Sequence, residues 1–131
     1  MRKIDAAALI AAASKIVGGF ACSDECSAGS VAAALLTEAG DVFTGICIDA
    51  CSSLGFCAEH AAIADMLKNR QTRVRAIVAV RESGEVLVPC GRCRELIRQA
   101  HPANWDTQII LPGDRIEPLS ALLPHSEPSQ R

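Results

Sequence analysis

Two short stretches of the chain carry residues that can bind a metal ion and move protons. The first is Cys57-Ala58-Glu59, and the second is Pro89-Cys90-Gly91-Arg92-Cys93. Three thiolates leave one open position on a tetrahedral metal ion, where a water molecule can be activated. A carboxylate that does not bind the metal, here that of Glu59, can move protons beside this water. Together the two stretches predict a catalytic zinc site.

The spacing of these residues favours one shared site. Each stretch reads as the start of a helix, where free backbone N–H groups stabilise a thiolate. Cys90 and Cys93 are three residues apart, so the first turn of one helix can present both to one ion, and Cys57 supplies the third thiolate. Glu59 follows Cys57 too closely to be a comfortable fourth ligand, but it can reach the bound water. Pro-Cys-x-x-Cys with an upstream glutamate beside a ligand is a signature of zinc deaminases.

The surrounding pattern predicts the elements that position these helix starts. Asp5 is the expected N-cap of the first helix, and the strands are apolar almost without alternation, which is typical of a sheet covered on both faces. Segments 20–29 and 50–55 are expected to be loops, 119–123 one or two helical turns, and 124–131 a loose tail. The order of elements predicts an α/β fold in which a mixed five-stranded sheet contains a hairpin. The predicted helices span 6–17, 57–69 and 90–100, and the predicted strands span 31–37, 42–49, 75–80, 86–88 and 108–111.

Composition limits the class of protein. The 131 residues are enough for one domain, expected over 1–131, and a net charge of −2 argues against nucleic acid as a partner. The longest apolar run, near 6–13, is too short to span a membrane. Seven cysteines without a secretory signal indicate a reducing compartment, so we expect a cytoplasmic protein whose clustered cysteines serve a metal or catalysis.

At its motifs the chain resembles the small cytidine deaminase superfamily, which includes the free-nucleoside cytidine deaminases and blasticidin S deaminase. The resemblance covers roughly 30–124 and implies a three-layer α/β/α sandwich, one zinc ion per subunit and a homotetramer or dimer. It also implies hydrolytic loss of ammonia from an aminopyrimidine ring. The residues that carry it are Cys57-Ala58-Glu59, Pro89-Cys90-Gly91-Arg92-Cys93-Arg94-Glu95-Leu96, Val42-Phe43-Thr44-Gly45 and Leu122-Leu123-Pro124.

The resemblance also implies a role for each residue of the two motifs. Cys57, Cys90 and Cys93 would be the zinc ligands. Glu59 would take a proton from the activated water and deliver it to the ring nitrogen and then to the leaving amine. The backbone of Ala58 would face the amine that is exchanged.

Two basic side chains can offset the charge of the site. Three thiolates leave Zn²⁺ with a net charge of −1, which opposes ionisation of the water. Arg92, between two ligands, and His60, beside Glu59, are the candidates. Many family members have arginine where this chain has His60, and a neutral histidine compensates less, so Arg92 is favoured. The alternatives are a solvated Arg92 and a His60 that packs or caps.

The residues expected to contact the substrate depart from the family pattern. Cytidine deaminases usually have Asn-x-Glu to hold the ribose hydroxyls, and the closest match here is Cys47-Ile48-Asp49. Asp49 can accept one hydroxyl hydrogen bond, but Cys47 cannot replace both halves of an amide. A stacking phenylalanine is replaced by Glu127, and another is missing near Ser30. Phe56 is a candidate for the pocket wall or for packing.

These features predict a zinc-dependent hydrolytic deaminase of a cytosine-like aminopyrimidine, a nucleoside or nucleoside analogue bound through non-standard contacts. Ordinary cytidine or deoxycytidine is the alternative substrate. A rival hypothesis is a non-catalytic, zinc-stapled binding domain in which Cys47 or Cys51 closes the site as a fourth ligand. A polynucleotide-editing deaminase is disfavoured because the chain lacks a basic channel and aromatic platforms. Cys22 and Cys26 are interpreted as ordinary loop or buried thiols, with metal binding as the alternative.

Overall fold

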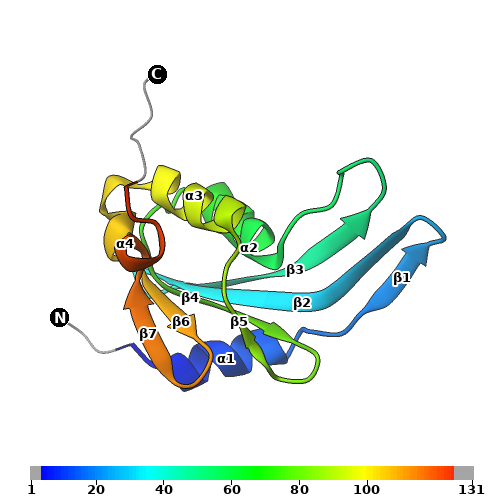
Figure 1. Ribbon diagram of the computed structural model, residues 1–131, viewed down its shortest axis with the longest axis horizontal. Helices are drawn as coiled ribbons and strands as arrows, with labels where there is room; N and C mark the ends of the chain where they lie inside the picture. Colours follow the sequence, from blue (N-terminus) through cyan, green and yellow to red (C-terminus); the bar gives the residue numbers. More distant parts are fainter. Residues whose placement is uncertain (1–3, 126–131) are drawn as a thin grey trace.

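The computed structural model describes residues 4–125, which form a mixed sheet with helices on both faces (Figure 1). The helices are α1 (Ala6–Ser14), α2 (Ala58–Lys68), α3 (Gly91–Ala100) and α4 (Leu119–Leu122), with one 3-10 helix, η1 (Pro102–Asp106). The strands are β1 (Phe20–Ser23), β2 (Cys26–Thr37), β3 (Val42–Ala50), β4 (Val74–Arg81), β5 (Val86–Leu87), β6 (Gln108–Leu111) and β7 (Arg115–Pro118).

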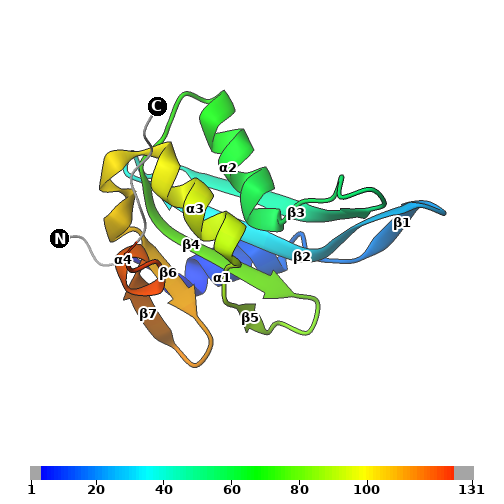
Figure 2. The ribbon, with the colours of Figure 1, turned by 45° about the horizontal axis from the view of Figure 1, so that its top comes forward.

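Strand β2 pairs with three other strands. It pairs antiparallel with β1, β3 and β4, and the hairpin with β3 confirms the prediction from sequence. Strand β4 pairs antiparallel with β5 but parallel with β6, which is reached through α3. The sheet is therefore mixed. Helix α2 follows β3 in the chain and helix α3 follows β5, and both helices lie on the same side of the sheet (Figure 2).

The described residues contain seven strands, not the five that the sequence predicts. Strand β1 lies in the segment expected to be a loop. All four of its residues are exposed, so no hydrophobic pattern marks it, and it exists because Phe20 and Ala21 pair with Ala28 and Ser27 of β2. None of the four residues of β7 is buried either, and this strand is defined by its antiparallel pairing with β6.

The first helix is also shorter than predicted. Asp5 is its N-cap as expected, because its side chain accepts a hydrogen bond from the Ala8 N–H at 3.0 Å. The helix ends at Ser14 rather than near residue 17. Beyond it, the Gly18 N–H donates to the Gly29 carbonyl at 2.8 Å, which draws the chain toward β2.

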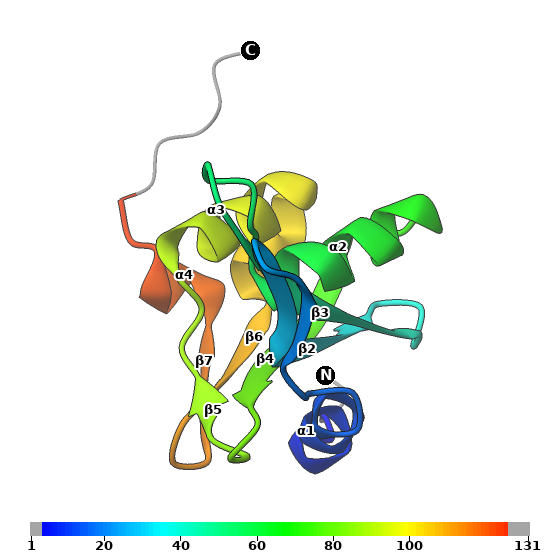
Figure 3. The ribbon, with the colours of Figure 1, turned by 90° about the vertical axis from the view of Figure 1, so that its right-hand side faces the viewer.

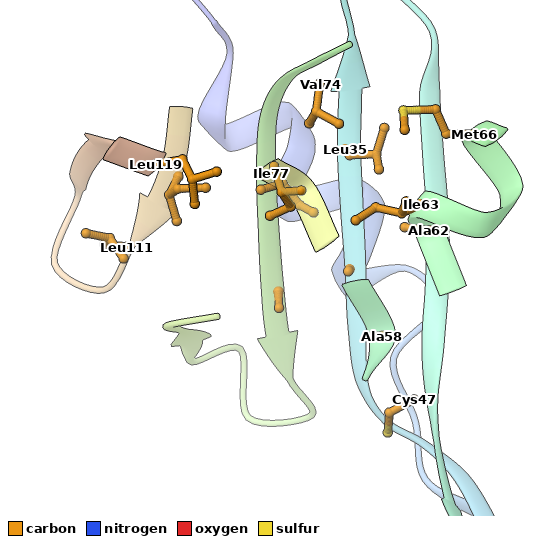
Figure 4. Close-up of a cluster of buried hydrophobic side chains, with 14 residues drawn as sticks. Leu35, Cys47, Ala58, Ala62, Ile63, Met66, Val74, Ile77, Leu111 and Leu119 are labelled. Carbon is orange, nitrogen blue, oxygen red and sulfur yellow. The ribbon is translucent and has the colours of Figure 1, made fainter. Parts of the chain in front are cut away.

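Alternate residues of the strands face two separate cores. Ala32 and Ala34 pack with α1 on one face of the sheet, whereas Ala33 and Leu35 pack with α2 on the other. Figure 3 shows α1 on one side of the sheet and α2 and α3 on the opposite side. Both faces are covered, which explains the apolar strands and confirms the predicted three-layer α/β/α sandwich. Figure 4 shows the larger core, with Ala58, Ala62, Ile63 and Met66 of α2 over the sheet.

Small residues let α2 approach the sheet closely. A Cβ atom on Gly45 of β3 would lie 2.4 Å from the Ala62 nitrogen and 2.8 Å from the Ala58 carbonyl oxygen. Only glycine permits this separation, because any side chain would overlap the helix backbone. The contact fixes the position of the helix start that carries Cys57 and Glu59.

A buried asparagine anchors the other helix. Asn104 is fully buried; its Oδ1 accepts from the Val74 N–H at 2.9 Å, and its Nδ2 donates to the carbonyl oxygens of Thr72 and Ile97. These bonds tie the end of α3 to the start of β4.

In the described part of the chain, no helix combines the length and apolar character needed to cross a membrane. Most of the tail expected at 124–131, including Glu127, lies outside the described residues.

Candidate metal and catalytic site

Two of the three predicted ligands occupy the N-cap positions of helices. Cys57 precedes α2 and Cys90 precedes α3, both with extended backbone, and Cys93 lies in the first turn of α3. The chain reaches Cys57 through a short bridge in which Phe56 and Ile48 exchange two backbone hydrogen bonds of 2.9 and 3.0 Å. This bridge holds the start of α2 against the end of β3.

The three sulfur atoms converge as a metal site requires. The Sγ atoms of Cys57 and Cys90 are 3.6 Å apart, and those of Cys90 and Cys93 are 3.3 Å apart. Tetrahedral coordination with Zn–S bonds of about 2.3 Å places sulfurs roughly 3.8 Å apart, so this set fits zinc with modest adjustment. Within residues 4–125, this is the one group of histidine, cysteine or acidic residues whose ligand atoms all lie within 4.8 Å.

Neither cysteine considered as a fourth ligand joins that group. Cys47 lies on β3 and Cys51 follows its end, and both remain outside the set of converging thiols. The site therefore offers three protein ligands and keeps the open position typical of a catalytic zinc site. Cys22 and Cys26 belong to the β1–β2 hairpin and also lie outside the set.

Glu59 lies in the first turn of α2 and is only 6% exposed. Burial raises the pKa of its carboxyl group above the usual value, opposed in part by a backbone N–H and the Cys93 thiol. It lines the same cavity as Cys57 and Cys90. A carboxyl group with a raised pKa holds its proton more readily than an exposed one, which suits it to proton exchange beside a metal site.

The three thiols differ in their electrostatic surroundings. Burial raises the pKa of Cys57 and of Cys93. Burial acts in the same direction on Cys90, but its pKa is lowered overall, because the backbone N–H groups of Cys93 and Arg92 and the two neighbouring thiols stabilise its thiolate. Loading the site with a metal ion must therefore displace protons from thiols that are protonated in its absence.

The two basic candidates take different positions. The His60 Nδ1 lies 3.5 Å from the Cys93 sulfur, so His60 contacts a ligand directly. Burial, and then the positive charge of Arg92, lower the pKa of His60. Arg92 is exposed and lines the cavity. A neutral His60 can orient the thiol, while Arg92 carries the positive charge near the site.

A cavity of about 510 Å³ is lined by Glu59 and by two of the three converging cysteines, Cys57 and Cys90. It lies between the β2–β3 side of the sheet and the starts of α2 and α3. All four residues predicted to contact a substrate, namely Cys47, Asp49, Phe56 and Ala58, line it. Sequence reasoning missed further wall residues that carry no motif of their own and are brought together only by the fold: Val31, Ile48, Ala50, Ser53, Gly55, Leu87 and Val88.

The part of the chain that carries the three thiols and Glu59 matches a known protein family. Residues 7–107 match the family model described as the cytidine and deoxycytidylate deaminase zinc-binding region. The match includes all three thiols and Glu59. The predicted resemblance is thereby confirmed, and zinc is the metal that corresponds to the three-thiol set.

Curated relatives include a cytidine deaminase of Mycobacterium tuberculosis, 38% identical over 69 residues that cover 52% of each chain. A blasticidin-S deaminase of Bacillus cereus is 37% identical over 81 residues, covering 55% of this chain and 58% of that protein. The chain thus spans little more than half the length of these curated relatives.

The likeness in three dimensions is more extensive. The crystal structure of cytidine deaminase from Mycobacterium tuberculosis has a TM-score of 0.81 with 29% identity, covering 97% of this chain and all of that one. A cytidine deaminase structure from Burkholderia pseudomallei has a TM-score of 0.74 with 28% identity, covering 95% and 100%. Motif, thiol geometry and fold agree, and the chain belongs to the cytidine and deoxycytidylate deaminase family.

Proposed function

We propose that the protein is a zinc-dependent hydrolytic deaminase of a cytosine-like aminopyrimidine. The observation that carries this proposal is the buried Glu59 carboxyl group, which shares a cavity with two of the three converging thiols. The relatives and solved structures compared above are named cytidine or blasticidin-S deaminases, which supports the same reaction class.

The metal ligands, Glu59 and the backbone of Ala58 have different roles in the proposed reaction. Cys57, Cys90 and Cys93 would hold the zinc ion, which would supply Lewis-acid activation of a water molecule. Glu59 takes the proton of that water and delivers it to the ring nitrogen, which makes the amine-bearing carbon a better electrophile. Once the oxygen of that water has bonded to this carbon, Glu59 moves the second proton of the oxygen to the amine, and the C–N bond breaks to release ammonia. The backbone at Ala58, which is fully buried and lines the cavity, faces this amine.

The substrate is a nucleoside or nucleoside analogue that is bound through non-standard contacts. Cys47 and Asp49 line the cavity where the family pattern has an amide and a longer acid. Among residues 4–125, the aromatic side chain that lines the cavity is Phe56, which is 37% exposed. Ring stacking and recognition of a ribose are therefore weaker than in an ordinary cytidine deaminase.

The zinc-stapled binding domain is the second candidate. It requires a closed site with four protein ligands, whereas the converging set in residues 4–125 has three. It also leaves no task for a carboxyl group buried beside the thiols. Both points favour the enzyme.

Replacing Glu59 by glutamine tests the proposed reaction. Zinc-loaded protein is assayed for ammonia release and for the absorbance change of the ring with cytidine, deoxycytidine, cytosine and analogues with altered sugars. We expect Glu59→Gln to lower kcat by at least about 100-fold, because general acid–base catalysis contributes on the order of 10²–10⁴. Its zinc content should equal that of the wild type.

Glu38→Gln, at the exposed β2–β3 turn, is the matched control and should retain activity. Wild-type activity in Glu59→Gln would remove Glu59 from the mechanism. Absence of turnover by the zinc-loaded wild type would favour the binding domain. Efficient turnover of both cytidine and deoxycytidine would defeat the proposed change of specificity.

We further propose that the chain is one domain over 1–131, that it acts in the cytoplasm on a small molecule, and that it assembles as a homotetramer or dimer. The apolar side chains exposed on the isolated subunit support assembly: Ile16, Val42, Leu54, Leu67, Val88 and Ile116 are each at least 37% exposed. Sedimentation of the zinc-loaded protein tests whether it assembles as a homotetramer or a dimer.

A further inference from the structure

The β1–β2 hairpin carries two cysteines that the proposed reaction does not use. Cys22 lies in β1 and Cys26 begins β2, with the tip of the hairpin between them. The hairpin projects from the end of the sheet remote from α4 and β7 (Figure 1). Cys22 is exposed and Cys26 is half-buried, so a small reagent in the solvent can reach Cys22 directly.

The register of the hairpin brings these two residues opposite one another. Ser27 of β2 pairs with Ala21, whereas its neighbour Cys26 pairs with Ser23, so Cys22 is the extra residue of a β-bulge. In a bulge, two residues of one strand oppose a single residue of the other, here Cys22 and Ser23 against Cys26. Opposed residues of antiparallel strands have Cα atoms about 4.5–5.5 Å apart, and disulfides span roughly 4.4–6.8 Å. The backbone therefore places the pair at a separation that a disulfide can bridge.

The thiols meet as the register requires. A hydrogen bond with the Cys22 side chain is the largest effect that raises the pKa of Cys26, so the two thiols are within hydrogen-bonding reach. The exposed Cys51 lies near the hairpin tip, because it follows Ala50, the partner of Cys26 on β3. Its sulfur can donate to the Glu25 carbonyl at 3.9 Å. A third thiol therefore lies beside the pair.

A second zinc site does not account for these cysteines. Among residues 4–125, the hairpin thiols do not belong to a set of three or more ligand groups that converge within 4.8 Å. A zinc ion needs three or four protein ligands. Two thiols within hydrogen-bonding reach, one of them exposed, are instead suited to exchange with a disulfide.

We propose that Cys22 and Cys26 form a reversible intrachain disulfide by exchange with a low-molecular-weight disulfide of the glutathione class. The thiolate of the exposed Cys22 attacks one sulfur of that molecule, which forms a mixed disulfide and releases one thiolate. The thiolate of Cys26 then attacks the Cys22 sulfur and releases the second. The two cysteines give up two protons and two electrons, which convert the small disulfide into two thiols.

The disulfide would join β1 to β2 at a point next to the cavity. Cys26 pairs with Ala50, and Ala50 lines the cavity. In a reducing compartment, a bridge between accessible thiols is transient rather than structural. The pair is therefore a redox-responsive site separate from the three converging thiols, and this inference does not rest on the deaminase function.

Exposure of the reduced, zinc-loaded protein to excess glutathione disulfide tests the exchange. After the remaining thiols are blocked, the protein is unfolded and cut by a protease that cleaves after Asp24 or Glu25, which separates Cys22 from Cys26. Mass spectrometry then detects the bridge as two linked peptides. We expect the bridge to exceed the mixed disulfide by at least about tenfold, because linked groups reach effective concentrations of about mM, far above that of the released glutathione. The zinc content should not change.

Single variants identify the two partners. Cys26→Ser should stop at a mixed disulfide on Cys22, and Cys22→Ser should form no bridge. Cys51→Ser is the matched control, because it removes the third thiol and should form the bridge as the wild type does. The inference is overturned if the wild type stays reduced, stops at the mixed disulfide or bridges Cys51 instead. A bridge in Cys22→Ser, or oxidation of the zinc ligands ahead of the pair, also overturns it.

Discussion

At the scale of single residues, the site depends on a few side chains whose positions follow from where two helices begin. Cys57 and Cys90 are N-caps, and Cys93 and Glu59 each lie in the following turn. Free N–H groups at a helix start stabilise negative charge, which suits a site built from thiolates. The His60 ring contacts the Cys93 sulfur and adds a neutral partner to a ligand.

Exchanging one cysteine at a time tests which thiols hold zinc. Cys93→Ser should lose most of the bound metal, because it removes a thiolate from a site with only three protein ligands. Cys22→Ser, in the exposed β1–β2 hairpin, should keep about one zinc per chain. Metal analysis of the purified variants measures both. Loss of zinc from Cys22→Ser would mean that the hairpin thiols take part in metal binding.

At the scale of elements, the close contact between β3 and α2 positions the helix start that carries Cys57 and Glu59. A Cβ atom on Gly45 would lie 2.4 Å from the Ala62 nitrogen and 2.6 Å from the Ala61 Cβ. The helix cannot shift without moving its N-cap, Cys57, and Glu59 in its first turn. Packing of the scaffold and geometry of the site are therefore coupled through one small residue.

Gly45→Ala tests this coupling. We expect a loss of roughly 1–3 kcal/mol in the free energy of unfolding, because the added methyl group overpacks a helix–sheet contact. Zinc affinity should fall with it. Gly18→Ala is the control: no atom lies within 4 Å of the added Cβ, so stability should change by less than about 0.5 kcal/mol. Urea unfolding of both variants gives the two values, and equal stability would contradict the coupling.

At the scale of the whole molecule, the candidate zinc site joins two helices that the core places on one face of the sheet. Cys57 belongs to the start of α2, whereas Cys90 and Cys93 belong to α3. Asn104 independently ties α3 to β4 through its buried hydrogen bonds. Metal binding thus adds a second connection between elements that are far apart in sequence.

Removing zinc should therefore lower the thermal stability. A ligand at about 100 times its Kd stabilises the folded state by roughly 2.7 kcal/mol, which corresponds to a shift of about 10 °C in Tm for a domain of this size. Calorimetry of the wild type with zinc and after chelation measures the shift. In Cys93→Ser the two conditions should give nearly the same Tm. An unchanged Tm for the wild type would argue against a zinc ion that bridges α2 and α3.

Local patterns were sufficient to predict much of this protein. Ligand chemistry depends on residue type and short spacing, so Cys57, Cys90 and Cys93 are recognisable without a fold, and the structure brings them together. The long apolar strands and the capped helices are also local signals, and the three-layer sandwich follows from them and from the family resemblance. The sequence did not predict β1 and β7, because these short strands carry no hydrophobic alternation. They form by pairing with β2 and β6.

The composition of the cavity was decided by the tertiary structure. The sequence shows that Cys47 and Asp49 replace an amide and a longer acid, but it does not show which groups remain free. In the folded chain, Ser30 and Val31 of β2 engage the Cys47 thiol, while the Asp49 carboxylate stays without an ion pair in residues 4–125. Hydrogen-bond partners from a neighbouring strand depend on the pairing register, which becomes explicit only when the strands are assembled into the sheet. The sequence therefore indicated the reaction, and the fold decided which chemical groups the substrate meets.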